Sequence, residues 1–184
     1  MKFEYEAKRT VLKILDPGNA QMALEFLEKN RDFFEPHEPK KPENYYTKSY
    51  IETTMEYEYK LALKLALMRY WVFLKEDPST IIGTLAVTDV RRGAASCCQI
   101  GYRFDKDHLH MGYATESIMT LVPELFTSLG VHRIEANVMP KNIDSVKLLE
   151  RLGFESEGIA RASVRIQGRW EDHIRYALIN DSDM

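Results

Sequence analysis

The stretch from Cys97 to Glu116, CCQIGYRFDKDHLHMGYATE, most constrains how this chain can fold, because an expected strand leads through a short loop directly into an amphipathic helix. Gly112 lets the backbone come close to a ligand, and the free N–H groups of the next helical turn point outward with partial positive charge. Apolar residues then recur with the helical period, at Ile118, Leu121, Val122, Leu125, Phe126 and Leu129. We therefore expect a loop that is anchored to a core and holds a phosphate-bearing ligand.

Several motifs around this loop occur in an order that is typical of a known family. The loop reads Leu109, His110, Met111, Gly112, Tyr113 and Ala114, and GYATE is followed by LGVHRIEANV, then by NIDSVKLLERLGF and EG. Together these pieces resemble the GNAT superfamily of acetyl-coenzyme A-dependent N-acetyltransferases, and in particular its ribosomal-protein (RimJ/RimL-like) branch. The family's loop starts with Arg or Gln, which Leu109 replaces here. The resemblance covers about residues 81–179.

Length and composition limit the class of protein. The 184 residues are expected to form a single domain, residues 1–184, with one sizeable core. No apolar run reaches membrane-spanning length, and the N-terminus lacks the apolar segment of a signal peptide, so we expect a cytoplasmic protein without a membrane partner. The net charge of −3 argues against a nucleic-acid partner. A monomer and a homodimer both stay open.

In the first half of the chain, the patterns predict a strand at residues 8–15 and a helix that Asp16 caps. The proline-rich residues 31–44 are expected to form a loop, and a second helix is expected at about residues 43–66. Three strands should follow as an antiparallel meander, at residues 68–75, 81–90 and 95–104.

In the second half, Pro123 is expected to kink the helix that follows Gly112. A strand at residues 132–139, a short helix from Asn142 that stops at Gly153, and a closing hairpin at residues 158–179 complete the chain. These elements predict an α/β, GNAT-like fold (acyl-CoA N-acyltransferase). Its mixed, mostly antiparallel sheet should have about seven strands and about four flanking helices.

The resemblance implies acetyl-coenzyme A as co-substrate, with its pantetheine arm along the strand before the loop and Asn142 near the thiol end. Asn142 can also serve as a helix N-cap. Lys147 and Arg151 lie one turn apart and either contact the 3′-phosphate or face solvent. The residues expected to contact the co-substrate are Tyr102, Arg103, Phe104, Leu109, His110, Met111, Gly112, Tyr113, Ala114, Thr115, Asn142 and Lys147.

Acetyl transfer to an amine needs an acid for the departing thiolate and a base for the amine's proton. By resemblance, Ser145 lies near the cofactor sulfur, where it acts as the thiolate acid or orients the reacting groups. Many family members carry a tyrosine one turn later, and Leu149 occupies that position here.

The base has several candidates. Val164 stands where some relatives have a glutamate, which leaves Glu116, Glu135, His173 or a chain of water molecules. Each candidate also has a structural interpretation: Glu116 suits the first turn of a helix, Glu135 can face either side of its strand, and His173 can be part of the fold.

The segment FFEPHEP resembles the substrate-side loop of the same branch, which makes Phe34, Glu35, His37 and Glu38 candidates for an acceptor pocket whose acids attract a cationic amine. A packed connector is an equal alternative. We expect no metal, because His108 and His110 have no third ligand nearby in the sequence.

The sequence therefore predicts an N-acetyltransferase that modifies a primary amine by direct attack in a ternary complex. The N-terminal α-amine of a protein is favoured over a lysine side chain, because its pKa is near 8 rather than about 10.4. A small amine, such as a polyamine, an aminoglycoside or an amino-acid derivative, is a second acceptor class. A regulatory protein that binds acetyl-coenzyme A without turnover is the non-enzymatic alternative.

Overall fold

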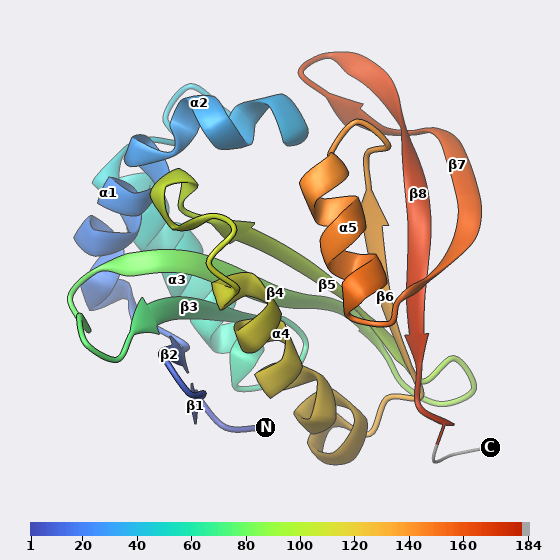
Figure 1. Cartoon of the computed structure of the whole chain (residues 1–184). Helices are drawn as coiled ribbons and strands as arrows, with labels where there is room; N and C mark the ends of the chain where they lie inside the picture. The colour runs from blue at the N-terminus through green and yellow to red at the C-terminus, as the bar shows by residue number, and fades with distance from the viewer. Residues whose placement is uncertain (182–184) are drawn as a thin grey trace.

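Eight strands form one mixed sheet in the computed structural model, which describes residues 1–181 (Figure 1). Their order in the sheet is β1-β2-β3-β4-β5-β6-β8-β7, and all neighbours are antiparallel except β5 and β6. The strands are β1 (Glu4–Glu6), β2 (Thr10–Lys13), β3 (Met68–Leu74), β4 (Ile81–Arg91), β5 (Cys97–Phe104), β6 (Arg133–Val138), β7 (Glu155–Ile166) and β8 (Arg169–Ile179). The predicted mixed, mostly antiparallel sheet is confirmed, with one strand more than expected.

Five α-helices connect these strands within residues 1–181, and none of them is long and apolar enough to cross a membrane. They are α1 (Ala20–Lys29), α2 (Arg31–Phe34), α3 (Lys48–Ala62), α4 (Tyr113–Glu124) and α5 (Ile143–Arg151). The shorter turns are η1 (Pro17–Asn19), η2 (Glu35–His37), η3 (Lys106–His108) and the π-helical η4 (Leu125–Leu129).

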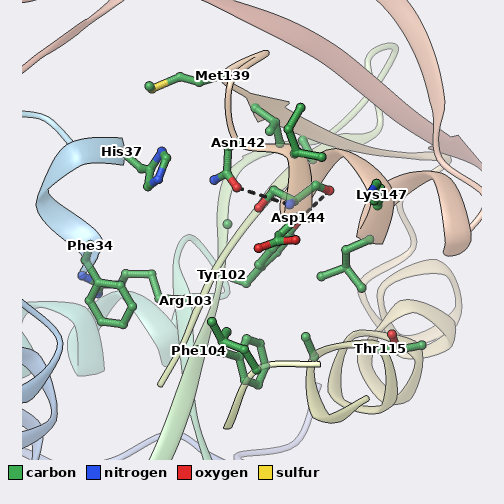
Figure 2. A pocket seen from close by; sticks show the side chains of 18 of the residues that line it. Phe34, His37, Tyr102, Arg103, Phe104, Thr115, Met139, Asn142, Asp144 and Lys147 are labelled. Atoms are coloured by element: carbon green, nitrogen blue, oxygen red, sulfur yellow. Dashed lines mark hydrogen bonds between the residues drawn. The ribbon is translucent and has the colours of Figure 1, made fainter. Parts of the chain in front are cut away.

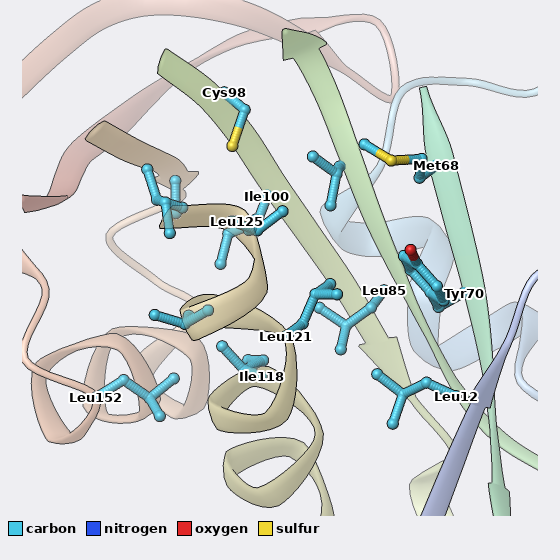
Figure 3. Close-up of a cluster of buried hydrophobic side chains, with 14 of the residues drawn as sticks. Leu12, Met68, Tyr70, Leu85, Cys98, Ile100, Ile118, Leu121, Leu125 and Leu152 are labelled. Atoms are coloured by element: carbon cyan, nitrogen blue, oxygen red, sulfur yellow. The ribbon is translucent and has the colours of Figure 1, made fainter. Parts of the chain in front are cut away.

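The alternating side chains of β3 divide the core into two layers, because neighbouring residues in a strand face opposite sides of the sheet. Tyr70 and Val72 pack in the layer under α4 and α5, part of which is shown in Figure 3. Trp71 and Phe73 pack against α1 and α3 on the other face. Helices therefore cover both faces of the sheet: α4 and α5 pack on one face, and α1 and α3 pack on the other.

The N-terminal segment departs from the single strand predicted at residues 8–15. It forms a hairpin of β1 and β2, closed by a hydrogen bond of 2.9 Å from the Ala7 N–H to the Thr10 carbonyl. The predicted helix at residues 43–66 is shorter, because Thr47 caps α3 by accepting the Tyr50 N–H at 3.3 Å.

The proline-rich residues 31–44 were expected to be a loop, but they contain α2 and η2. Pro36 lies in the first turn of η2, where its missing N–H costs no hydrogen bond. Figure 1 shows α2 facing the β7–β8 hairpin across the ends of β5 and α5. This segment therefore lies beside the space where the central strands separate.

The structure shows how α4 and α5 end. Pro123 lies inside α4, and the chain widens into the π-helical η4 two residues later. Gly153 adopts a left-handed conformation (φ 84°), and the Phe154 N–H bonds to the Leu149 carbonyl at 3.0 Å. These bonds confirm the predicted Schellman stop at Gly153.

The only parallel pair in residues 1–181, β5 and β6, has a short contact. Pairing runs from Cys97 to Gln99 on β5 and from Arg133 to Glu135 on β6, after which the strands diverge (Figure 1). The remaining length of β5 still pairs with β4, but its other edge has no strand beside it. The divergence creates a wedge between the two halves of the sheet.

Asp105, directly after β5, fixes the chain that leads out of this wedge. Its side chain is buried, contacts Lys29 Nζ at 2.7 Å and Asn30 Nδ2 at 3.3 Å, and accepts the Asp107 N–H at 2.8 Å. Burial alone would raise the pKa of Asp105, but the hydrogen bonds from Lys29 and Asp107 outweigh burial and hold the pKa below its ordinary value. The carboxylate thus joins α1 to the segment before the ligand loop.

We predict that Asp105→Asn lowers the free energy of unfolding by about 2 kcal/mol at neutral pH, because a charged acceptor of several hydrogen bonds is lost. A carboxyl group whose pKa is lowered on folding stabilises the fold at any pH above its pKa in the unfolded chain. This contribution disappears as the pH falls through the pKa of the folded state. Urea titrations should therefore show the difference between parent and variant narrowing below about pH 4. The exposed neighbour Asp107 provides the control Asp107→Asn, with a change of less than about 1 kcal/mol. A difference in the free energy of unfolding between parent and Asp105→Asn that does not vary with pH would contradict this role of Asp105.

Candidate active site

A cleft of about 710 Å³ occupies the wedge between β5 and β6. Its walls come from α2 and η2 on one side and from α4 and α5 on the other. Figure 2 shows Phe34 and His37 on one side of this space, Thr115 and Lys147 on the opposite side, and Tyr102 between them. The cleft therefore connects the loop before α4 with the segment that contains α2 and η2.

The loop before α4 presents free backbone donors to the cleft. His110 (φ 59°) and Gly112 (φ 81°) are both left-handed, which turns the chain sharply into the helix. The N–H groups of Tyr113, Ala114 and Thr115 have no acceptor within residues 1–181, and these three residues line the cleft. Unpaired N–H groups at the start of a helix are a favourable site for a pyrophosphate.

Arg9, directly before β2, supports this loop from the side opposite the cleft lining. Its guanidinium donates to the Met111 carbonyl at 3.0 Å and to Glu116 at 2.8 Å, and it stacks on the Tyr113 ring at 4.5 Å. A Cβ at Gly112 would lie 3.3 Å from Arg9 Nη2, so a larger residue there would press against the clamp. Arg9 thus places a cation beside the loop whose usual polar residue is replaced by Leu109.

Glu116 is committed to the same clamp. One carboxylate oxygen accepts the N–H groups of Arg9 at 2.6 Å and Thr10 at 3.0 Å, and the other accepts the Arg9 guanidinium. Burial alone would raise the pKa of Glu116, but these hydrogen bonds outweigh it and hold the pKa below its ordinary value. The side chain is a structural tie between α4 and β2 and does not line the cleft.

The far part of β5 forms the floor of the cleft. Tyr102, Arg103 and Phe104 all line it, and on the side of β6 they have no paired strand. A Cβ at Gly83 on β4 would lie 2.6 Å from the Phe104 ring, so glycine is what allows this ring to pack beside β4. An extended ligand can therefore lie along β5 and use main-chain groups that the sheet leaves free.

The start of α5 brings Asn142 and Ser145 to the same floor. Asn142 caps the helix by accepting the Ser145 N–H at 3.3 Å, which leaves its amide group free for a ligand (Figure 2). The Tyr102 hydroxyl donates to the Ser145 carbonyl at 3.4 Å, and burial raises the pKa of Tyr102 to about 12. Leu149 is fully buried in the core, so this position offers no polar group to the cleft.

The α2 and η2 side of the cleft contains a half-buried ion pair. Glu38 contacts Arg103 Nη1 at 3.2 Å and Lys41 Nζ at 2.8 Å. Burial alone would raise the pKa of Glu38, but the charges of Arg103 and Lys41 outweigh it and hold the pKa below its ordinary value. Gln167, in the β7–β8 turn, donates to the carbonyls of Glu35 and Glu38 and so joins the two walls.

Most of the predicted site residues meet in this cleft, and four do not. The residues that line it are Phe34, His37, Glu38, Tyr102, Arg103, Phe104, Leu109, His110, Gly112, Tyr113, Ala114, Thr115, Asn142, Ser145 and Lys147. Glu35, Met111, Glu116 and Glu135 are not among the lining residues. Glu135 faces Arg91 and Arg133, each at 2.8 Å, so neither predicted carboxylate base reaches the space near Ser145.

The two acids predicted to attract the acceptor, Glu35 and Glu38, both have cationic partners in the structure. Glu38 has two cationic partners, and Glu35 pairs with Arg31 at 3.0 Å. The residues that sequence analysis overlooked are Arg9 and Gln167, which act across more than a hundred residues and leave no local pattern. Within residues 1–181, no cluster of His, Cys, Asp and Glu side chains is arranged to hold a metal ion.

We predict that Arg9→Ala weakens binding of acetyl-coenzyme A about tenfold, because the loop loses a charge-assisted clamp worth roughly 1.5 kcal/mol. Isothermal titration calorimetry measures this directly. The matched control is Lys13→Ala in β2, the strand that follows Arg9, where loss of a partly exposed pair with Glu4 at 3.3 Å should leave the affinity unchanged. Equal affinities for Arg9→Ala and the parent would remove Arg9 from the binding site.

Comparisons with known proteins agree with this geometry. Residues 9–155 match the family model described as the acetyltransferase (GNAT) domain. The chain is 37% identical to a probable N-acetyltransferase, YjcK, of Bacillus subtilis (strain 168), over 97% of this chain and 98% of that protein. It is 29% identical to the [ribosomal protein uS5]-alanine N-acetyltransferase of Escherichia coli (strain K12), over 96% and 91% of the two chains.

A solved structure shows the same architecture. The ribosomal-protein-S5-alanine acetyltransferase from Vibrio fischeri superposes with a TM-score of 0.92 at 26% identity, over 98% of each chain. Free N–H groups at the start of α4, the open edge of β5 and the family match together fit a bound acetyl-coenzyme A. The chain belongs to the GNAT family and is an acetyl-coenzyme A-dependent N-acetyltransferase.

Proposed function

We propose that the acceptor is the N-terminal α-amine of a protein, of the ribosomal-protein type, and that the enzyme works in the cytoplasm. Two relatives that align with nearly the whole chain, from Escherichia coli and Vibrio fischeri, carry names that specify an alanine of a ribosomal protein. Their similarity supports the same class of acceptor here.

The charge of the acceptor side is the observation that carries this proposal. Glu35 and Glu38 are both paired with cations of the chain. Lys141, which lines the cleft as Glu38 does, is paired with Glu171 at 3.0 Å. A polyamine or an aminoglycoside carries several positive charges and needs unpaired acids, which Glu35 and Glu38 do not supply. A chain terminus brings one amine that is partly neutral at neutral pH.

The co-substrate supplies an activated acetyl thioester, and the chain supplies its position. The free N–H groups at the start of α4 bind the pyrophosphate, and Lys147 and Arg151 face the same end of the cleft. The open edge of β5 and the amide of Asn142 direct the arm toward Ser145. Holding both reactants in one cleft converts the transfer into an effectively unimolecular step.

A panel of acceptors tests the proposal. We expect an alanine-initiated peptide with a free α-amine to release coenzyme A thiol and to gain one acetyl group at its first residue, as mass spectrometry would show. The same peptide with a blocked α-amine and an internal lysine is the matched control, and it should stay unmodified because a lysine amine is mostly protonated at neutral pH. Turnover with spermidine or an aminoglycoside but with no peptide would overturn the proposal.

Ser145 gives a second prediction. Its hydroxyl lies in the cleft at the start of α5, where we place the sulfur end of the co-substrate. Ser145→Ala should lower kcat roughly 100-fold through the loss of a group that orients or protonates the thiolate, while the affinity for acetyl-coenzyme A changes little. Ser156→Ala, an exposed position on β7 that does not line the cleft, is the comparison for a serine outside this helix start. Unchanged turnover in Ser145→Ala would exclude the assigned role.

A further inference from the structure

His173 is an imidazole in the cleft that the assignments above do not use. It lies on β8, next to Ile174, which pairs with Val138 at the end of β6. The residue is only 7% exposed, yet it lines the cleft together with Met139 and Lys141. This position is at the acceptor side of the cleft, where β6 ends and the chain turns toward α5.

The contacts of one ring nitrogen determine which tautomer fits. His173 Nδ1 lies 3.3 Å from the Glu171 carbonyl oxygen and 3.4 Å from Ser163 Oγ. A carbonyl oxygen can only accept a hydrogen bond, whereas a serine hydroxyl can do either. The arrangement therefore favours a proton on Nδ1, which leaves the lone pair of the neutral ring on Nε2.

The second ring nitrogen is open. His173 Nε2 has no hydrogen-bond partner within residues 1–181, and it is not among the buried atoms that lack one, so this atom is accessible to solvent. An imidazole that is fixed through Nδ1 and free at Nε2 has the arrangement of a general base held by an orienting group.

Two other groups on the α2 and η2 side of the cleft, Glu38 and His37, compare unfavourably as bases. Glu38 is neutralised by Arg103 and Lys41, and burial and the charge of Lys141 hold the pKa of His37 below its ordinary value. Unlike His173, which the Glu171 carbonyl orients, the His37 side chain makes no hydrogen bond within residues 1–181. His173 is thus the best-oriented proton acceptor of the acceptor side.

The two acidic neighbours of His173 on β8 are already paired or bonded. Glu171 contacts Lys141 at 3.0 Å, and the Asp172 carboxylate accepts the Ala162 N–H at 2.7 Å. The titratable groups on the surrounding elements are Glu171, Asp172 and Arg175 on β8, Arg161 and Arg165 on β7, Lys141 after β6 and His37 in η2.

We propose that His173 Nε2 takes the proton of the acceptor amine during acetyl transfer, directly or through one water molecule. The amine nitrogen bonds to the thioester carbonyl carbon, its proton passes to Nε2, and the carbon–sulfur bond breaks with its electron pair on sulfur. Sulfur then gains a proton from Ser145 or solvent, and His173 returns its own proton to solvent. This inference rests on the proposed function, since it requires an amine acceptor in the cleft.

The test compares His173→Gln with the matched control His132→Gln, a histidine before β6 that does not line the cleft, using the best peptide from the acceptor panel. Glutamine can fill the space but cannot accept the proton. We expect His173→Gln to lower kcat/KM roughly 100-fold, with unchanged acetyl-coenzyme A affinity, and His132→Gln to change it far less. Added imidazole should restore part of the activity of His173→Ala, which a merely structural role would not allow.

The pH profile gives a second readout. At acid pH, kcat/KM of the parent should fall with the square of the proton concentration, because both the amine and the base must lose a proton. The kcat/KM of His173→Gln should fall with only the first power of the proton concentration. If kcat/KM of the parent falls with only the first power of the proton concentration over the whole acid range, the inference is overturned, even where the variants fold poorly. Full activity of His173→Gln overturns it while leaving the proposed function intact, and a parent inactive on every amine overturns both.

Discussion

The short pairing of β5 with β6 is the constraint on which the rest of the structure depends. Two parallel strands that separate after Gln99 and Glu135 leave backbone groups along β5 without a strand partner. Buried backbone groups must be satisfied, so the open edge has to meet solvent or a ligand. α4 and α5 both begin at this opening, which directs unpaired N–H groups and the Asn142 cap into one space. The binding site is therefore a consequence of how the sheet separates.

The loop before α4 also shows how binding geometry depends on distant parts of the chain. His110 and Gly112 hold left-handed conformations that a loop would not keep without support. Arg9 and Glu116 supply that support by joining β2 to the first turn of α4, and Asp105 fixes the preceding segment to α1. The free donors are thus oriented before any ligand arrives, which lowers the entropy that binding must overcome.

The sequence was sufficient where a feature depends on neighbouring residues. Gly112, Asn142 and Gly153 each carry a local backbone signal, and the α/β sheet and both helix ends followed from such signals. It was insufficient where a side chain has two possible partners. Glu116 suits either a base or a helix start, and only its hydrogen bonds to Arg9 and Thr10 decide between them. Likewise, the pairing of Glu38 with Arg103 joins segments that have no common local pattern.

The same long-range pairing explains why an imidazole suits this cleft better than a carboxylate. The lining cations Arg103 and Lys141 face acidic partners, so an additional anionic base beside them would be held as an ion pair and lose basicity. A neutral ring that the Glu171 carbonyl orients avoids this loss. An α-amine is partly neutral at neutral pH and gives up its proton only as the new bond forms, so a base of imidazole strength is sufficient. A lysine ε-amine must first lose a proton at a far greater cost, so a base of imidazole strength fits the proposed chain-terminus acceptor better than a lysine side chain.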